Sequence, residues 1–374
     1  MSEWKETTLG KEVNLITGFP FKSSQYTNNL QDTRLLRGDN IVQGKLRWDG
    51  VKRWSSDDST IDPIYQLREG DVVLAMDRPW IEAGLKFSVI SRFDIPSLLV
   101  QRVACIRSGD RIKKDFLRYL IASKEFTQHI LSVETGTAVP HISPSQIKEF
   151  SFKLPEVIEQ QAIATVLSSL DDKIDLLHRQ NKTLEAMAET LFRQWFIEEA
   201  SEDWEEVPLG NFFEISSGKG LKKEQLVENG AYSVFGANGE IGRTNDFLFN
   251  EKLLFTGRVG TLGNIFIIDK EKIWLSDNTL VFRNVKYFYF VYFVLKTARL
   301  GDYNAGSTQP LIRQSDIKEI PINSPNGEIL EKFEMLSIRM FEKIKTNKKQ
   351  IKTLEKLRDN LLPKLMSGEV RVRF

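Results

Sequence analysis

Residues 136–155 read GTAVPHISPSQIKEFSFKLP, and residues 306–325 read GSTQPLIRQSDIKEIPINSP. Aligned with a constant shift of 170 positions, the two stretches share eight identical residues. These are Gly136/Gly306, Pro140/Pro310, Ile142/Ile312, Ser145/Ser315, Ile147/Ile317, Lys148/Lys318, Glu149/Glu319 and Pro155/Pro325. Because chance alone would give about one or two identities, the chain contains an internal repeat, and the repeat decides its architecture.

The repeat extends in both directions from this stretch. Downstream, QNKTLE (180–185) matches QIKTLE (350–355) with the same shift. Upstream, WKETTLG (4–10) matches WEEVPLG (204–210) with a shift of 200, so the second copy is shorter in its middle. A tandem duplication that keeps its ends and varies its middle predicts one shared frame that carries two different binding domains.

The composition indicates a protein of the reducing cytoplasm without membrane spans. The 374 residues suit two or three domains, and 41% apolar residues are ample for their cores. The first residues, MSEWKE, lack the apolar stretch of a signal peptide, and YFYFVYFVL (287–295) is too short to span a bilayer. A single cysteine, Cys105, excludes an internal disulfide framework.

The charge changes sign along the chain and helps to divide it. Residues 1–155 carry a net charge of +3, residues 156–200 of −5, residues 201–325 of −2 and residues 326–374 of +5. We expect a mixed α/β domain in the first and third of these segments. The second and fourth should each be a long helix, one acidic and one basic.

Both predicted helices carry apolar residues at alternating spacings of four and three, which is typical of a coiled-coil seam. Helices of opposite charge should pair with each other, and an antiparallel arrangement would relate the two copies by a pseudo-two-fold axis. The antiparallel register pairs Asn181 with Asn347, Leu184 with Ile344, and Leu177 with Ile351. A buried asparagine pair would fix this register. The alternative is that both asparagines lie at the edge of the seam in water.

The fold class expected is therefore α/β (α+β), with two mixed α/β domains joined by an antiparallel coiled coil. In the first domain, 71–76, 85–90 and 97–106 read as strands and 115–133 as a helix. In the second domain, 285–298 reads as a helix. The diverged middle of each copy thus contains both strands and helices.

The sequence contains no recognisable catalytic motif. A glycine-rich cofactor loop is missing, and no Pro-Pro dipeptide occurs, which excludes the Asp/Asn-Pro-Pro-aromatic motif of amino-methyltransferases. One cysteine and three scattered histidines cannot build a zinc cluster. We interpret the chain as a binding protein that holds no metal or cofactor of its own.

Two variable α/β domains, each followed by a long helix that carries the repeated stretch, resemble the specificity (S) subunit of type I restriction–modification enzymes. The resemblance covers the whole chain. Its most specific parts are GDVVLAMDRPWIEAGLK (70–86), LPEVIEQQAIATVLSSLDDKIDLLHRQNKTLEAMAETLFRQWF (154–196), GRVGTLGNIF…WLSDNTLVF (257–282) and KLRDNLLPKLMSGEVRV (356–372).

This resemblance implies a function for each segment. Residues 1–155 and 201–325 would be target recognition domains, each reading one half of a bipartite, asymmetric site in double-stranded DNA. The helices in 156–200 and 326–374 would form the spacer and dock two methyltransferase subunits, which restriction subunits then join. The resemblance implies a chain without catalytic activity, in a complex that uses S-adenosylmethionine, ATP and Mg²⁺.

Two arginines are candidate DNA contacts. Arg78 and Arg258 follow predicted strands in turns flanked by glycine or proline, and we predict that they are equivalent positions of the two copies. There a guanidinium could reach guanine O6 and N7 or a phosphate. The alternative for Arg78 is an internal ion pair with Asp77 or Asp71.

The other candidates lie in loops and turns. Lys22 and Lys222 follow equivalent glycine turns, where they could contact phosphate or stay solvated. Further candidates are Lys86, Lys219, Lys223, Arg243, Asn238 and Asn245. Thr137, His141, Thr308 and Gln309 lie beside the coil, where packing at the joint between domain and helix is the alternative to DNA contact.

Other functions compete with this interpretation. The chain could be the specificity subunit of a type II-like (IIB/IIG-type) methyltransferase–nuclease. It could also be a non-catalytic coiled-coil scaffold, or a nuclease with dispersed carboxylates. The last two do not explain why the frame is repeated while the domains diverge.

Overall fold

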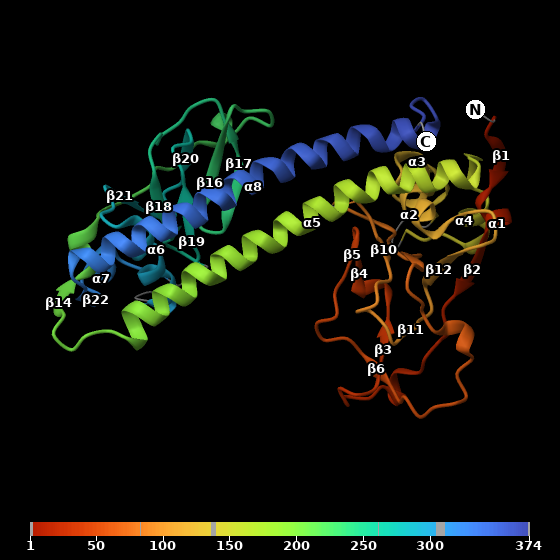
Figure 1. Ribbon diagram of the computed structural model, residues 1–374, viewed down its shortest axis with the longest axis horizontal. Helices are drawn as coiled ribbons and strands as arrows, with labels where there is room; N and C mark the ends of the chain where they lie inside the picture. Colours follow the sequence, from red (N-terminus) through yellow and green to blue (C-terminus); the bar gives the residue numbers. More distant parts are fainter. Residues whose placement is uncertain (1–2, 83, 136–139, 261, 304–310, 373–374) are drawn as a thin grey trace. The chain divides into compact units, whose positions relative to one another are not determined.

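The computed structural model describes residues 3–82, 84–135, 140–260, 262–303 and 311–372 (Figure 1). The chain divides into two compact units. The first contains Met1–Asp175 and Ile351–Phe374, and the second contains Leu176–Gln350. Each long helix therefore contributes one part to each unit. None of the described helices is long and apolar enough to cross a membrane.

The first unit is built on two sheets and a strand pair. A four-stranded antiparallel sheet has the order β10 (Phe87–Val89), β7 (Val72–Ala75), β12 (Val103–Ser108), β2 (Val13–Thr17). A three-stranded sheet has the order β11 (Ser97–Leu99), β3 (Thr33–Leu36), β6 (Arg53–Trp54), with β11 parallel to β3. The remaining strands form the pairs β1 (Lys5–Thr8) with β13 (Ser151–Leu154), β4 (Ile41–Val42) with β5 (Lys45–Leu46), and β8 (Trp80–Ile81) with β9 (Gly84–Leu85). The short helices are α1 (Leu9–Glu12), α2 (Lys114–Ala122), α3 (Lys124–Val133) and α4 (Pro144–Lys148).

The second unit repeats this plan with fewer elements. Its four-stranded sheet has the order β15 (Glu214–Ser217), β21 (Thr279–Arg283), β18 (Leu253–Gly257), β19 (Ile265–Ile268). Its three-stranded sheet has the order β17 (Gly239–Thr244), β16 (Tyr232–Gly236), β20 (Ile273–Leu275), with β20 parallel to β16. β14 (Glu205–Pro208) pairs with β22 (Pro321–Ser324), and the short helices are α6 (Phe288–Thr297) and α7 (Gln314–Lys318). Strand order and direction thus agree between the units, which confirms two mixed α/β domains on one frame.

The repeated residues hold equivalent contacts in both units. Leu9 N donates to Phe150 O at 2.8 Å, and Leu209 N donates to Ile320 O at 2.9 Å. At Gly10 an added Cβ would lie 2.8 Å from the side chain of Lys148, and at Gly210, two hundred positions later, the neighbour is again the repeated lysine. The Gly–Lys identities of the repeat therefore reflect a close packing of two backbone segments that leaves no room for a side chain.

The units differ most in length between the strands of the three-stranded sheet. In the first unit the chain leaves β3, forms the hairpin β4–β5, and returns in β6. In the second unit β16 turns back directly into β17, through Ala237 and Asn238. Much of the length difference between the copies is therefore an insertion at the tip of one sheet, where it disturbs no strand of the frame.

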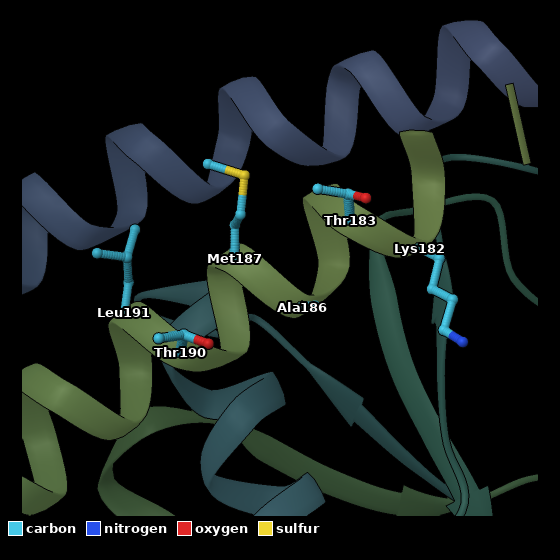
Figure 2. Close-up of a pocket in the computed structure, with 6 residues that line it drawn as sticks. All are labelled: Lys182, Thr183, Ala186, Met187, Thr190 and Leu191. Carbon is cyan, nitrogen blue, oxygen red and sulfur yellow. The ribbon is translucent and has the colours of Figure 1, made fainter. Parts of the chain in front are cut away.

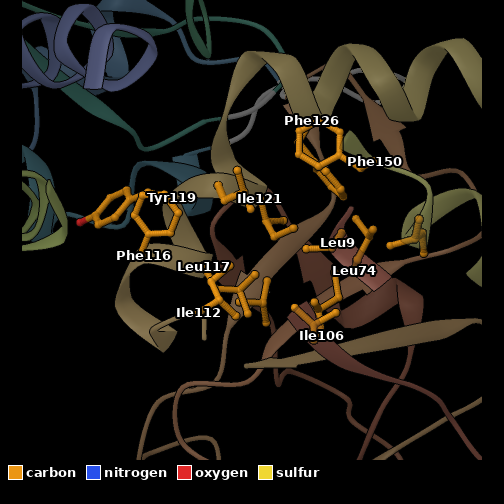
Figure 3. Close-up of a cluster of buried hydrophobic side chains, with 14 of the residues drawn as sticks. Leu9, Leu74, Ile106, Ile112, Phe116, Leu117, Tyr119, Ile121, Phe126 and Phe150 are labelled. Carbon is orange, nitrogen blue, oxygen red and sulfur yellow. The ribbon is translucent and has the colours of Figure 1, made fainter. Parts of the chain in front are cut away.

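The first unit buries its main core between the four-stranded sheet and the helices (Figure 3). Leu74 of β7 and Ile106 of β12 are fully buried in one cluster with Phe116 of α2. Ile163 and Leu365, from the two long helices, belong to the same cluster. The helices are thus part of the domain core. At roughly 1.5–3 kcal/mol per buried large apolar side chain, this contact anchors each helix end firmly.

The two long helices are α5 (Val157–Arg193), which continues into a π-helical turn (Gln194–Glu198), and α8 (Gly327–Ser367). They run antiparallel within each unit. In the first unit Arg358 Nη1 donates to Asp171 Oδ1 at 3.1 Å, and in the second unit the Trp195 ring lies 6.3 Å from that of Phe333. The predicted coiled coil of an acidic and a basic helix is confirmed in both parts.

The two asparagines of the predicted register are hydrogen-bonded to each other. Asn347 Nδ2 donates to Asn181 Oδ1 at 2.9 Å, and Asn347 is fully buried. Asn347 Oδ1 is buried without a partner among the described residues. The alternative position, with both side chains in water at the edge of the seam, is therefore wrong for Asn347.

Replacing both asparagines by leucine is expected to raise the free energy of unfolding by about 1–2 kcal/mol, because a buried, half-satisfied amide pair costs more than an apolar one. The single Asn347→Leu change should be less stable than the double change, since it leaves the Asn181 amide unpaired. Chemical denaturation measures both. A double variant less stable than the original chain would contradict this account.

Two sequence predictions need correction. The single helix expected over 115–133 is two helices, α2 and α3, because Ser123 is extended and its Oγ accepts a hydrogen bond from Phe126 N at 3.1 Å. The single strand expected over 97–106 is β11 and β12, which belong to different sheets. Between them, Arg102 adopts a left-handed φ of +67°. The apolar run at 287–295 does form a buried helix, α6, as expected.

Candidate nucleic-acid interface

The first unit has a polar depression of about 370 Å³ where β3, β7 and β12 meet the turns that follow or precede them. It is lined by Tyr26, Arg37, Gly38, Asp39, Asp77, Arg78, Lys86, Val100, Gln101 and Arg102. A second depression of about 270 Å³ shares Arg37 and Asp39 with it and adds Arg47 and Lys52. Cations outnumber carboxylates across both, so this face attracts a polyanion.

Two of the lining arginines have unusual backbone geometry. Arg78 has a φ of +46° and Arg102 a φ of +67°, in the left-handed region that non-glycine residues rarely adopt. Both are held there by hydrogen bonds, from Arg78 N to Pro140 O at 2.7 Å and from Met76 N to Arg102 O at 2.9 Å. Strain of this kind costs about 1–3 kcal/mol per residue and is typical of ligand-binding sites.

Asp77 lies beside one cation of this depression, Arg102, and beside His141. Its Oδ1 lies 2.6 Å from His141 Nδ1 and 3.8 Å from Arg102 Nη1. Lys86 is half-buried, and burial lowers its pKa, although Asp39 acts in the opposite direction. The site therefore holds Arg102 beside the carboxylate of Asp77. It also holds Lys86, whose charged form would be stabilised by contact with a negative group.

Arg78 makes neither of the ion pairs that were its alternative role. Asp71 is bonded to Arg107, at 2.7 Å from Nη2 to Oδ2, and Asp77 is bonded to His141. Among the residues that the structure describes, no ion pair of Arg78 is found, and its side chain is exposed. The guanidinium of Arg78 is thus available to a ligand.

Arg258 is not the counterpart of Arg78, and this prediction was wrong. Ile312 N donates to Arg258 O at 3.0 Å, as Ile142 N donates to Met76 O at 2.9 Å. Arg258 therefore corresponds to Met76. Its side chain is half-buried, and its Nη1 lies 3.5 Å from Ser217 Oγ. The two turns have diverged, so an arginine in each does not make the two positions equivalent. The register of the strands decides which residues of the two units correspond.

Lys22 and Lys222 do stand on equivalent turns. Gln25 N donates to Lys22 O at 3.0 Å, and Gln225 N donates to Lys222 O at 3.0 Å. Both lysines are exposed, as are Lys219 and Lys223 near Lys222. This is the position expected of phosphate contacts, and it stays a prediction.

Two candidates of the second unit are engaged within the protein. Arg243 donates from Nε to Gly230 O at 2.7 Å and from Nη2 to Ala231 O at 3.1 Å. Asn245 Oδ1 accepts from Ala231 N at 3.2 Å. Both side chains brace the loop before β16. Asn238, in contrast, is exposed at the turn between β16 and β17.

The candidates beside the coil are only partly described. Thr137, Thr308 and Gln309 lie outside the described residues. His141 is bonded to Asp77 and exchanges backbone hydrogen bonds with Thr135, at 2.7 and 2.9 Å. His141 therefore contacts the depression through Asp77, which lines it.

Sequence reasoning missed Arg37, Gln101 and Arg102, which line the depression. Gln101 and Arg102 were hidden inside an apolar run that read as one strand. The polar pair QR within SLLVQRVACI was the available signal, because two adjacent polar residues break the alternation of a strand.

The second unit also carries an apolar groove on α5, with a volume of about 510 Å³ (Figure 2). It is lined by Lys182, Thr183, Ala186, Met187, Thr190 and Leu191. Met187 is 49% exposed. A groove of this kind on a helix suits a protein partner.

Comparison with known proteins identifies the family. The family model described as the type I restriction modification DNA specificity domain matches residues 1–186 and 201–357. The chain is 30% identical over 307 residues to the MjaIX type I restriction enzyme specificity subunit of Methanocaldococcus jannaschii, covering 70% of each protein. It is 33% identical over 190 residues to the EcoAI specificity subunit of Escherichia coli, covering 50% of this chain and 31% of that one.

A solved structure shares the fold. The S subunit of a type I restriction–modification system from M. genitalium superimposes with a TM-score of 0.61 at 19% identity, covering 97% of this chain and 96% of that one. At this identity the likeness concerns the fold alone. Together with the matched domain model, which covers most of both units, it leads to one conclusion: the chain belongs to the family of type I restriction–modification DNA specificity proteins.

Proposed function

We propose that the chain is the sequence-specific DNA-binding subunit of a type I restriction–modification complex. Each unit reads one half of a bipartite, asymmetric site in double-stranded DNA, and the coiled coil sets the distance between the halves. The observation that carries this proposal is the repeated frame with two different surfaces at one place on it. Symmetry of a protein normally mirrors symmetry of its DNA site, so two unlike surfaces favour two unlike half-sites.

In this proposal the chemistry belongs to partners. Two methyltransferase subunits dock on the chain, and restriction subunits join them. The complex uses S-adenosylmethionine, ATP and Mg²⁺, while this chain binds none of them. The exposed Met187 and the apolar groove around it support a docking surface for a protein on α5.

The surface charge fits the same division of labour. The chain as a whole has a net charge of only +1. Non-specific DNA affinity comes mainly from neutralised phosphates, so a nearly neutral subunit needs partners that supply part of this contact. The basic depression of the first unit is then free to read bases.

The test is a genome-wide methylation map of cells that express the chain with its methyltransferase subunit. We expect one motif with two unlike half-sites separated by a fixed, unspecified gap. A palindromic or continuous motif would show that the second unit reads nothing. Cleavage at a fixed distance outside the motif by a fused nuclease would instead favour the type II-like alternative.

Lengthening the coil should change the gap and nothing else. Seven residues inserted after His178 and seven after Lys349 preserve both heptad seams and add about 10 Å. At 3.4 Å per base pair, we expect the gap to grow by about three base pairs, with both half-sites unchanged. Methylation mapping of this variant measures the gap directly.

The matched control for this change inserts seven residues in α5 alone. This variant breaks the pairing of the two helices, and we expect it to lose methylation. A gap that stays the same after the double insertion would rule out the coil as the spacer.

A further inference from the structure

The frame allows the lining of the polar depression in the first unit to be compared, residue by residue, with the equivalent positions of the second unit. Met76 N donates to Arg102 O at 2.9 Å, and Arg258 N donates to Asn278 O at 2.8 Å. Since Met76 and Arg258 are equivalent, Arg102 and Asn278 are equivalent too. Each stands immediately before an inner strand of its four-stranded sheet, β12 or β21.

A second pair follows from the edge strands. β10 and β19 pair with β7 and β18 in the same register. Lys86 precedes the first residue of β10, and Asn264 precedes the first residue of β19. A third asparagine, Asn238, lies in the turn after β16, as Arg37 and Asp39 lie after β3. Two cationic side chains of the first unit, Arg102 and Lys86, are thus replaced by the carboxamides of Asn278 and Asn264 in the second.

The surroundings changed together with these side chains. Asp77, which holds Arg102, forms a backbone bridge with His141, and Val259 forms the equivalent bridge with Leu311. Val259 thus stands at the position of Asp77 in the unit where Asn278 stands at the position of Arg102. Arg78 corresponds to Gly260, which has a φ of +82°. The left-handed turn therefore persists in the second unit without a side chain.

The asparagines of the second unit are free to bind. Asn238, Asn264 and Asn278 are exposed, and their side chains have no hydrogen-bond partner within the described part of the chain. Arg102 keeps 61% of its side chain exposed while Asp77 orients it. Exposed hydrogen-bonding side chains at the end of a sheet are what the readout of a base edge requires.

We propose that the two units read different bases with the same part of the frame: Arg102, with Arg78 and Lys86, reads guanine in one half-site, and Asn278, with Asn264, reads adenine in the other. Arginine and lysine bind O6 and N7 of guanine, and asparagine forms two hydrogen bonds with N6 and N7 of adenine. Asp77 is a positioning residue for Arg102. This inference rests on the proposed function and adds the bases to it.

The test is made on the complex of the chain with its methyltransferase subunits. Methylation is mapped for the wild-type chain and for Arg102→Gln and Asn278→Asp. We expect Arg102→Gln to relax the preference for one guanine in one half-site by about tenfold or more, and Asn278→Asp to do so for an adenine, other than the methylated base, in the other half-site. Each change should leave the opposite half-site as it was.

A chemical probe covers the case in which a variant no longer methylates. In 7-deazaguanine the N7 acceptor is missing. Site DNA that carries it at the assigned guanine should bind the wild-type complex about tenfold more weakly than unmodified DNA does. The Arg102→Gln complex should bind the two DNAs equally well. 7-Deazaadenine at the assigned adenine makes the same comparison for Asn278→Asp.

Matched controls come from the opposite ends of the same strands. Arg92 follows β10, whose other end carries Lys86, and Asn250 precedes β18, whose other end leads to Arg258. Both are exposed. Arg92→Gln and Asn250→Asp should leave the motif unchanged.

The outcomes separate the two proposals. A bipartite wild-type motif whose bases do not change in either variant, with equal sensitivity to the deaza bases, overturns the base assignment alone. A change in both half-sites from one variant overturns it as well. A wild-type map without any bipartite motif overturns the proposed function and this inference with it.

Discussion

Replacing Phe333 by alanine is expected to lower the free energy of unfolding of the second unit by about 3–5 kcal/mol. Phe333 is fully buried, and its ring lies 5.1 Å from that of Phe196 and 6.1 Å from that of Phe293. The cavity would open where α8, α5 and α6 meet, so few neighbours can move in to fill it. Chemical denaturation, followed by hydrogen exchange in α6, measures the loss.

Met335 on the same helix provides the control. It is 56% exposed, and Met335→Ala should change the free energy of unfolding by less than about 0.5 kcal/mol. If Phe333→Ala were equally mild, the aromatic cluster would not be the core of this unit.

Replacing Arg107 by methionine is expected to cost the first unit about 3–5 kcal/mol, because it leaves the carboxylate of Asp71 buried and unpaired. Asp71 is 3% exposed. Arg107 donates to it from Nε at 2.8 Å and from Nη2 at 2.7 Å, while Arg68 N donates to Oδ2 at 2.8 Å. Asp71 directly precedes β7, the strand that leads to Asp77, so the loss should also weaken DNA binding.

A second change distinguishes lost charge pairing from lost packing. Asp71→Asn combined with Arg107→Met removes the charge and keeps an oxygen for Arg68 N. We expect this double variant to recover most of the lost stability in denaturation experiments, as a double-mutant cycle of a buried pair should show. A double variant as unstable as the single one would assign the effect to the packing of the Arg107 side chain.

The repeat and the seam were readable from the sequence for a physical reason. The repeated positions make the same contacts in both units, as Gly10 and Lys148 do, so their identities are constrained together. The heptad positions are constrained by burial along two helices. Both signals consist of residue types at fixed spacings, and both predicted the correct elements.

The candidate DNA-binding surface was harder to predict, because it is made of strand ends that different long-range hydrogen bonds bring together. Arg102 became visible only when β11 and β12 separated into two sheets. By sequence Arg258 looked equivalent to Arg78. The hydrogen bond from Ile312 N to Arg258 O shows that Arg258 is instead the equivalent of Met76. No motif or spacing in the sequence marks Asn264 and Asn278 as binding residues. Single letters in diverged loops do not fix register, and register decides which side chains share a face.

One contact of the frame bears on how such proteins acquire new targets. At Gly18 an added Cβ would lie 2.2 Å from Val100 O, and at Gly218 it would lie 2.2 Å from Ser276 O. Mutation can hardly move these two points, yet the loops that leave them differ in length and chemistry. In evolutionary terms, the two glycine positions are conserved while the loops between the shared strands are free to change. In the proposed function, a lineage could therefore acquire a new DNA target by changing one unit at a time, while the half-site read by the other unit stays the same.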